Sequence, residues 1–271
     1  MNLPIYYERS LIRLIHGDSI SVLDQIPENS VQMVFADPPY FLSNDGITCQ
    51  AGRMVSVNKG KWDKSEGFQK DYEFTKSWIS KCRRILTDTG TIWISGTLHI
   101  IYKVGFILEE LGFKLLNDIV WFKPNASPNL ACRYFTHSHE NVLWAKKNPD
   151  AKHIFNYESM KNWDVSKDTI NNQGKQMRSV WSIPLTPQKE KSNGKHPTQK
   201  PLELLLRIIS ASSNEGDLIL DPFNGSGTTG IAAELLNRKY IGIELEKEYL
   251  DLTIARHAEI LNEKQQEKGK N

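Results

Sequence analysis

Short apolar stretches alternate with longer amphipathic ones along most of the chain. The short ones are rich in β-branched and aromatic residues, which predicts strands at residues 12–18, 31–37, 91–96, 117–122, 141–146, 217–221 and 240–244. In the longer ones apolar residues recur at helical spacing, which predicts helices at residues 74–86, 100–112, 201–213, 229–238 and 247–266. Strands that alternate with helices predict an α/β fold with a mainly parallel sheet and helices on both faces.

Two polar segments interrupt this alternation, at residues 41–70 and 147–195. Each is too long to be a simple connection between a strand and a helix. A chain of 271 residues is long enough for one large α/β domain with an insertion. We therefore expect two halves of one domain, at residues 1–146 and 196–262, that flank the second segment, with a polar tail at residues 263–271.

The composition is that of an ordinary soluble globular protein, because 39% of the residues are hydrophobic and 24% are charged. The sequence contains no run of eighteen apolar residues, and its start lacks the pattern of a signal peptide. The 3 cysteines lie far apart without a C-x-x-C pair, which indicates neither a disulfide framework nor a cysteine zinc site. These features predict a cytoplasmic protein with reduced thiols.

The net charge of +2 conceals a local excess of positive charge. Residues 146–200 contain eleven Lys and Arg against five Asp and Glu, whereas the rest of the chain contains 23 against 27. Aromatic residues such as Trp163 and Trp181 are interspersed in this basic segment. The combination suits a polyanionic partner. A solvated, lysine-rich insertion would have the same composition, so both interpretations remain open at this point.

A glycine-rich stretch follows the predicted strand 217–221 and opens a predicted helix. Gly225, Gly227 and Gly230 have the spacing of the G-x-G-x-x-G fingerprint, and Glu244 ends the next predicted strand. Glycines let the backbone approach a ligand closely, and Glu244 can accept hydrogen bonds from ribose hydroxyls. The stretch is therefore either the binding loop of a cofactor that contains adenosine or a purely structural turn.

Asp221 distinguishes between the cofactors that such a loop can bind. It begins an Asp-Pro-Phe turn and places a carboxylate beside the ligand, where a dinucleotide would bring its pyrophosphate. Negative charges repel each other strongly in a partly desolvated cleft. S-adenosylmethionine has no phosphate and carries a sulfonium and an ammonium group. Asp221 therefore favours S-adenosylmethionine over NAD.

The stretch VFADPPY (34–40) ends a predicted strand in an acid, two prolines and an aromatic ring. Asp37 can accept a hydrogen bond from an exocyclic amino group, which helps the nitrogen lone pair turn toward a methyl donor. Pro38 and Pro39 fix the backbone, so that its carbonyl groups can supply a second acceptor. Tyr40 can stack on a base extruded from a duplex. A rigid surface turn is the structural alternative, and the accompanying glycine-rich loop argues against it.

Together these motifs resemble those of the β group of amino-group DNA methyltransferases, in which D-P-P-Y precedes a recognition region and D-P-F-x-G-S-G comes late. The resemblance extends from IHGDS (15–19) through GKHPTQKPLELLLRII (194–209) to YIGIELEKEYL (240–250). It implies a circularly permuted Rossmann-like fold that depends on S-adenosylmethionine. Glu244 would end the strand that is second in unpermuted relatives, and Asp18 would follow the third.

The resemblance also implies which residues bind the cofactor. Asp18 would lie near the adenine, and His196 and Lys200 would flank the methionine portion. The remaining contacts would come from the ends of two strands and from the glycine-rich loop: Asp37, Asp221, Phe223, Gly225, Ser226, Gly227, Thr228, Thr229 and Glu244.

The target base follows from the resemblance less strictly. D-P-P-Y is typical of adenine-N6 enzymes and S-P-P-Y of cytosine-N4 enzymes, although the first position alone does not decide. FADPPYFLSN (35–44), PNLACRYFTHSHE (128–140) and FNYESMK (155–161) resemble the DpnII type, which methylates adenine in GATC. Enzymes that read GANTC share the first and third stretches more loosely. We predict adenine-N6 methylation of GATC, with cytosine-N4 methylation and the GANTC site as alternatives.

DNA is thus the expected partner, double-stranded or single-stranded. Residues 147–195 would form a target-recognition region in the major groove, and residues 41–70 a lid or a DNA-contacting loop. The side chains predicted to contact DNA are Ser43, Asn44, Arg133, Lys175, Gln176 and Arg178. Family relatives also imply a homodimer and a cognate restriction endonuclease as partners.

Three other interpretations are weaker. RNA and protein-glutamine methyltransferases place a related turn after the cofactor loop, whereas Asp37 precedes Gly225 here. A non-catalytic DNA-binding relative would show damage to one of the two motifs, and both are intact. His137, His139 and Glu140 have no further ligand at metal-site spacing, so no metal is expected.

Overall fold

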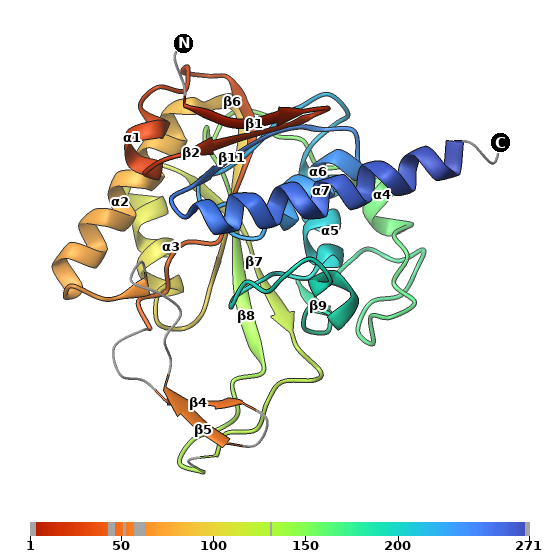
Figure 1. Cartoon of the computed structure of the whole chain (residues 1–271). Coiled ribbons are helices and arrows are strands. Elements are labelled where there is room, and N and C mark those ends of the chain that lie inside the picture. The colour runs from red at the N-terminus through yellow and green to blue at the C-terminus, as the bar shows by residue number, and fades with distance from the viewer. Residues whose placement is uncertain (1–3, 43–46, 51–52, 57–62, 131, 269–271) are drawn as a thin grey trace.

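A nine-stranded sheet forms the centre of the molecule (Figure 1). The structure is a computed structural model, which describes residues 4–42, 47–50, 53–56, 63–130 and 132–268. In order across the sheet, the strands are β1 (Ile5–Arg9), β2 (Ile12–His16), β11 (Lys239–Glu244), β10 (Leu218–Asp221), β3 (Val31–Ala36), β6 (Leu86–Gly96), β8 (His139–Lys146), β7 (Lys114–Phe122) and β9 (Val180–Ser182).

Most neighbouring strands of this sheet are parallel, which confirms the predicted fold class. The exceptions are β1, which is antiparallel to β2, and β8, which is antiparallel to both β6 and β7. The remaining pairs, from β2 across to β6 and between β7 and β9, are parallel. That the chain is circularly permuted stays a prediction.

Helices cover both faces of the sheet (Figure 1). One face carries α1 (Ser19–Leu23), α2 (Phe68–Ile85) and α3 (Ile101–Glu110). The other carries α5 (Leu202–Ser212), α6 (Thr228–Leu235) and α7 (Lys247–Lys268), with α4 (Tyr157–Lys161) against α5 and a 3-10 turn at Gln188–Lys191. A hairpin of β4 (Ile47–Gln50) and β5 (Arg53–Ser56) lies beyond the lower end of the sheet in Figure 1.

The central strands are apolar on both faces because helices bury both. Successive strand residues point to opposite sides, so Val34 packs toward α2 and α3 while Met33 and Phe35 pack toward α5. On the α5 face, the rings of Trp93 and Trp144 stack with centroids 4.7 Å apart. This double burial explains why the strands appear in the sequence as continuous apolar runs rather than as alternating ones.

All seven predicted strands and all five predicted helices are present, with shifted ends. The exposed edge strand β1 and the helix α1 were not predicted, because each is only five residues long and so gives little periodic signal. Helix α2 begins at Phe68 rather than at residue 74. Its first turn is secured by the buried Asp71, which accepts hydrogen bonds from the Ser65 hydroxyl and the Glu66 backbone.

The basic segment 147–195 is packed into the domain rather than loosely inserted. Asn156 donates hydrogen bonds to carbonyl groups at the end of α5. Asp168 forms a buried ion pair with Arg207 of α5 at 2.9 Å, and the Arg207 guanidinium lies 5.2 Å from the ring centre of Trp181 in β9. A role of this segment in target recognition stays a prediction. In the described part of the chain, no helix combines the length and apolar character that crossing a membrane requires.

Candidate active site

Four acidic residues lie where four neighbouring parallel strands end. Asp18 follows β2, Glu244 ends β11, Asp221 ends β10 and Asp37 follows β3. Because these strands run in the same direction, their carboxyl ends meet at one edge of the sheet, where open α/β sheets usually bind ligands. A cavity of ≈ 250 Å³ opens at this edge, and all four acids line it.

Asp221 and Glu244 are bound by neutral donors. Asp221 accepts hydrogen bonds from the Phe223 backbone at 2.9 Å and from the Thr229 hydroxyl at 2.6 Å. Glu244 accepts three from backbone N–H groups at 2.8, 2.9 and 3.0 Å, the shortest from Gly225. Burial raises the pKa of Asp221 to about 7 and also raises the pKa of Glu244. A cationic ligand would stabilise both carboxylates in their ionised form.

Helix α7 holds the glycine-rich loop in place. Arg256 donates hydrogen bonds to the carbonyl of Ser226 and the hydroxyl of Thr228. Gly227 has a φ of 73°, and a Cβ there would lie 2.2 Å from the Cγ2 of Thr253 on α7. Gly227 therefore allows α7 to approach the loop, and it is not among the residues that line the cavity. Its contact with the cofactor stays a prediction.

Asp18 and His196 both line the cavity. Their contacts with the cofactor stay predictions. Asp18 caps α1, because its Oδ1 accepts hydrogen bonds from the Ser21 backbone and hydroxyl, both at 2.9 Å. His196 packs edge-on against Tyr249 at 4.3 Å between ring centroids. A Cβ on Gly225, which has a φ of 50°, would approach the His196 ring to 3.3 Å. Glycine at position 225 thus satisfies both the backbone conformation and the nearby ring.

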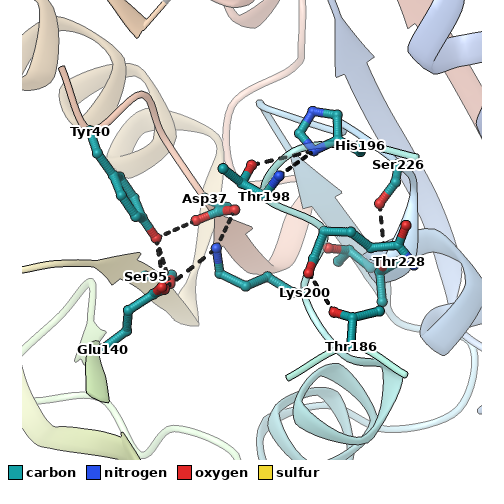
Figure 2. A network of polar contacts seen from close by, with 12 residues as sticks. Asp37, Tyr40, Ser95, Glu140, Thr186, His196, Thr198, Lys200, Ser226 and Thr228 are labelled. Carbon is teal, nitrogen blue, oxygen red and sulfur yellow. Dashed lines mark hydrogen bonds and ion pairs between the residues drawn. The ribbon is translucent and has the colours of Figure 1, made fainter. Parts of the chain in front are cut away.

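Asp37 lies in a network of mostly buried polar groups (Figure 2). Its Oδ2 accepts a hydrogen bond from Lys200 Nζ at 2.6 Å, and its Oδ1 accepts one from the Tyr40 hydroxyl at 2.6 Å. The Tyr40 hydroxyl also contacts Ser95 Oγ at 3.0 Å and Glu140 Oε2 at 3.1 Å. Lys200 Nζ lies 3.5 Å from the same Glu140 oxygen, between the two carboxylates (Figure 2). A cation and a phenol therefore fix the orientation of Asp37.

The charges around Lys200 determine the protonation states of this network. Burial by itself would raise the pKa of Glu140, but Lys200 and Lys123 hold that pKa at about 2. Burial would lower the pKa of Lys200, but Asp37 and Glu140 raise it above its ordinary value. Burial and the same two carboxylates raise the pKa of Tyr40 well above its ordinary value. At neutral pH, Glu140 is therefore a carboxylate, Lys200 an ammonium and Tyr40 a neutral donor.

The turn after Tyr40 depends on Asp63, a residue that the sequence did not single out. The fully buried Asp63 carboxylate accepts hydrogen bonds from the backbone N–H groups of Tyr40, Phe41 and Leu42 at 2.8, 2.9 and 3.2 Å. Phe41 has a φ of 58°, a left-handed conformation that costs a non-glycine residue about 1–3 kcal/mol. Asp63 stabilises this turn and so positions the D-P-P-Y backbone.

Of the residues predicted to contact DNA, the four that the structure describes do not line the cavity. Arg133 is exposed in the loop between β7 and β8. Three others are exposed and precede the edge strand β9: Lys175, Gln176 and Arg178. β9 lies four strands from β3, or about 19 Å at the usual strand spacing. Ser43 and Asn44 lie outside the described residues. Contact with DNA stays a prediction for all six.

Three members of the catalytic network were missed in the sequence. Glu140 was considered only as part of a metal site with His137 and His139, and Ser95 and Lys123 were not considered. Their places at strand ends could have indicated them. Ser95 lies near the carboxyl end of β6 and Lys123 directly follows β7. Glu140 lies near the amino end of the antiparallel strand β8, which is at the same edge of the sheet. No group of three or more His, Cys, Asp or Glu among the described residues could hold a metal ion.

The cavity lining fits S-adenosylmethionine better than a dinucleotide. Lys200 is the only Lys or Arg among the described lining residues, and it is already engaged by Asp37 and Glu140. A pyrophosphate would therefore meet carboxylates without a compensating cation, whereas a sulfonium and an ammonium would be stabilised by them. Glu244 can still accept from a ribose hydroxyl, since a carboxylate offers roughly four lone-pair positions.

A mostly parallel α/β sheet with this acid-lined cavity beside D-P-P-Y defines the class of S-adenosylmethionine-dependent methyltransferases. Within it, a family model of N6 and N4 methyltransferases, described as DNA methylase, matches residues 31–255. The chain belongs to this DNA methylase family.

Curated relatives place the chain near the DpnII type, as its motifs predicted. It is 53% identical over 248 residues to the Type II methyltransferase M2.DpnII of Streptococcus pneumoniae, covering 91% of this chain and 90% of the relative. M2.LlaDCHI of Lactococcus lactis subsp. cremoris is also 53% identical, with 91% and 89% covered. M2.MboI of Moraxella bovis is 49% identical over 262 residues, with 96% and 93% covered.

Solved structures share the fold. The M1.HpyAVI–SAM complex has a TM-score of 0.65 and 28% identity, covering 90% of this chain and 98% of that one. The cytosine-N4-specific PvuII DNA methyltransferase has a TM-score of 0.72 at 21% identity, covering 94% and 89%, and this likeness concerns the fold alone.

Proposed function

We propose that the protein transfers a methyl group from S-adenosylmethionine to the N6 amino group of adenine in DNA, at 5'-GATC-3' sites. The observation that carries the proposal is the oriented Asp37 carboxylate at the edge of an acid-lined cavity. The likeness to Type II methyltransferases such as M2.DpnII and M2.MboI supports DNA as the substrate. The first residue of D-P-P-Y and the DpnII-like stretches favour adenine in GATC.

The acids of the cavity would hold the cofactor by charge and by hydrogen bonds. Asp221 would face its cationic groups, Glu244 its ribose hydroxyls and Asp18 its adenine. Phe223 provides a fixed apolar wall, because its ring packs edge-on against the buried Trp78 at 5.3 Å between centroids. The bound cofactor supplies a methyl group on positively charged sulfur, which a nitrogen lone pair can attack.

Asp37 would activate the target nitrogen by accepting a hydrogen bond from its N–H. The adenine amino group is conjugated with the ring, so its lone pair becomes available only as that conjugation is lost in the transition state. A preorganised acceptor contributes there because it does not reorganise during the reaction. Lys200 and Tyr40 each occupy one position on Asp37, which leaves lone pairs for the substrate. The backbone carbonyl of Pro38 is the second acceptor in this proposal.

Tyr40 has a further role besides the stacking predicted for it. Its side chain is only 5% exposed, its hydroxyl binds Asp37, and Lys200 Nζ lies 5.3 Å from its ring centre. Tyr40 still lines the cavity, where the flipped base would be placed. Stacking on the base and orientation of Asp37 are therefore compatible roles of one side chain.

The loop between β7 and β8 would contact DNA beside the extruded base. Tyr134 is 61% and Phe135 97% exposed, next to the exposed Arg133. Exposed aromatic rings beside a cation suit unstacked bases and phosphates. The ends of this loop carry Lys123 and Glu140, which belong to the network around Asp37. The loop is therefore anchored at the catalytic site.

Phe135→Ala tests this DNA surface. We expect it to weaken binding to a GATC oligonucleotide about 5- to 30-fold while leaving cofactor affinity unchanged, because stacking contributes about 1–2 kcal/mol per base. Phe106→Ala is the matched control, since Phe106 is 63% exposed on α3. Equal effects of the two changes on DNA binding would contradict the assignment.

The same proposal places the protein in a restriction–modification system with a cognate endonuclease, acting as a homodimer on double-stranded or single-stranded DNA. Sedimentation of the purified protein tests the dimer. Methylation rates on matched duplex and single-stranded oligonucleotides test the preferred substrate. Challenge of methylated DNA with a GATC-cleaving endonuclease tests the protection.

The decisive experiment incubates the protein with labelled S-adenosylmethionine and plasmid DNA, followed by digestion to nucleosides and identification by mass. Labelled N6-methyladenine, together with plasmid that changes its sensitivity to GATC-specific cleavage, is the expected result. Labelled N4-methylcytosine would refute the target base, and N6-methyladenine outside GATC would refute the site. No labelled base would refute DNA methylation altogether.

A further inference from the structure

Glu140 contacts the same two side chains that orient Asp37. Tyr40 donates to Asp37 and lies 3.1 Å from Glu140 Oε2, while Lys200 binds Asp37 at 2.6 Å and lies 3.5 Å from the same oxygen. The other Glu140 oxygen binds Lys123 at 2.5 Å. Both partners of Asp37 are therefore shared with a second carboxylate (Figure 2).

The network is shielded from water and balanced in charge. The side chain of Lys200 is 7% exposed, and those of Glu140, Lys123 and Asp37 are 12%, 13% and 15% exposed. Two lysines thus face two acids in a partly desolvated site, where a charge without a partner is costly. Neutralising Glu140 would leave Asp37 as the one carboxylate, among the residues that the structure describes, that Lys200 contacts.

We propose that Glu140 is a positioning residue, which shares Lys200 and Tyr40 with Asp37 and thereby keeps the Asp37 carboxylate available to the target amino group. The inference rests on the proposed function. When Lys200 is shared, its charge is divided between two acids, and Asp37 remains a strong acceptor. When Lys200 pairs with Asp37 alone, the carboxylate is a weaker acceptor for a neutral N–H. Glu140 acts through these side chains and does not touch the substrate.

Glu140→Gln tests the role of the charge, because glutamine keeps the size and removes the charge. We expect turnover to fall about 10- to 100-fold, while cofactor affinity changes less than about threefold, since Asp221 and Glu244 are not part of the network. Glu110→Gln is the matched control. Glu110 also accepts hydrogen bonds from a lysine and a tyrosine, Lys76 at 2.6 Å and Tyr72 at 2.5 Å, but lies at the end of α3.

Glu140→Asp separates the charge from packing. Aspartate keeps the negative charge and loses a methylene, so a charge role predicts that Glu140→Asp turns over at least fivefold faster than Glu140→Gln. A packing role predicts the reverse order, because glutamine matches the volume of glutamate. Thermal unfolding of the wild type and of both variants shows whether any loss of turnover comes from a loss of folded protein.

The outcomes distinguish this inference from the proposed function. A wild-type protein that methylates DNA, with a Glu140→Gln variant within twofold of it, would overturn the inference alone. So would a Glu140→Gln variant that loses cofactor affinity as much as turnover, or one faster than Glu140→Asp. A wild-type protein that labels no base would overturn the proposed function and the inference with it.

Discussion

Asp221 and Asp37 lie at the ends of the adjacent strands β10 and β3, but their surroundings differ in charge. Among the described residues, a backbone N–H and a hydroxyl bind Asp221, and burial raises its pKa to about 7. Asp37 is bound by the Lys200 ammonium and the Tyr40 phenol. Under the proposed function this difference would match the two ligands, because a cationic cofactor brings its own charge whereas a neutral adenine amino group brings none.

The comparison also shows two ways of holding a buried carboxylate. In the cofactor half, a rigid loop supplies fixed donors, and α7 holds that loop through Arg256 and Thr253. Around Asp37, side chains from segments far apart in the sequence converge, among them Glu140 of β8 and Lys200, which precedes α5. Under the proposed function, the first arrangement suits a cationic cofactor that binds in the same way in every turnover, and the second suits a group that exchanges partners with each substrate.

Removing the catalytic carboxylate should have the largest effect. Asp37→Ala is expected to lower turnover about 10³-fold or more, roughly 4 kcal/mol, because it removes the acceptor of the target N–H. Cofactor affinity should change less than about tenfold, as measured by calorimetry. Asp24→Ala, which removes an exposed acid paired with Lys81, is the control. Turnover within about tenfold of the wild type would show that Asp37 does not have this role.

A methyl group added between the glycine-rich loop and α7 should have the second-largest effect. Gly227→Ala is expected to lower the free energy of unfolding by about 3 kcal/mol, because the methyl group combines a left-handed φ with overpacking against Thr253. Gly174→Ala is the control, with a φ of 77° and nothing within 4 Å of its Cβ, and should cost only about 1 kcal/mol. Urea unfolding measures both, and equal losses would argue against the tight contact.

Removing the charge of Asp221 should weaken cofactor binding and leave the network around Asp37 intact. Asp221→Asn is expected to raise the cofactor Kd about 10- to 100-fold at pH 8, because a cationic ligand loses a buried ionised partner. Asp18→Asn removes an exposed acid at the same cavity and should have a smaller effect. If both variants bound the cofactor like the wild type, the charge of Asp221 would not govern cofactor binding, and the comparison between Asp221 and Asp37 would fail.

The pH dependence of cofactor binding should be the smallest of these effects. With a pKa of about 7, Asp221 is largely protonated at pH 6 and ionised at pH 8. Cofactor affinity should therefore rise about tenfold over this interval in the wild type and stay flatter in Asp221→Asn. Calorimetry at matched ionic strength measures both curves.

The same group affects stability in the opposite direction. Its folded-state pKa of about 7 exceeds the ordinary value of 3.8 expected in the unfolded chain. Its contribution to stability is therefore present below pH 4 and is lost as the pH rises through 7. The cofactor-free wild type should lose stability relative to Asp221→Asn between about pH 4 and 7. A constant difference would show that Asp221 ionises normally.

Much of the fold and cofactor cradle was predictable because the relevant signals are local. A buried parallel strand appears as a short apolar run, and the residue that ends it lies at the ligand edge whichever neighbours it has. Asp221, Glu244 and Asp37 were located by their places at strand ends, whereas Asp18 was located through the family resemblance. The packing of Gly227 against Thr253 was not predictable, because a glycine required by a packed helix has the same sequence pattern as one required by a ligand.

The partners of the catalytic acid were not predictable in the same way. Tyr40 and Glu140 are 100 residues apart, and Asp37 and Lys200 are 163 apart. Asp63 is nearer, yet nothing in its local pattern distinguishes an acid that binds three backbone N–H groups from one on the surface. Only strand order brings β8 next to β6 and so places Glu140 beside Tyr40.

The sequence by itself determined the elements, the motifs and the preference for a cationic cofactor, because apolar periodicity, glycine spacing and the charge of Asp221 act locally. The tertiary structure alone decided which charges neutralise one another. Electrostatic energy depends on distance and on the exclusion of water, and the fold sets both when it brings Lys200 between Asp37 and Glu140 in a buried site.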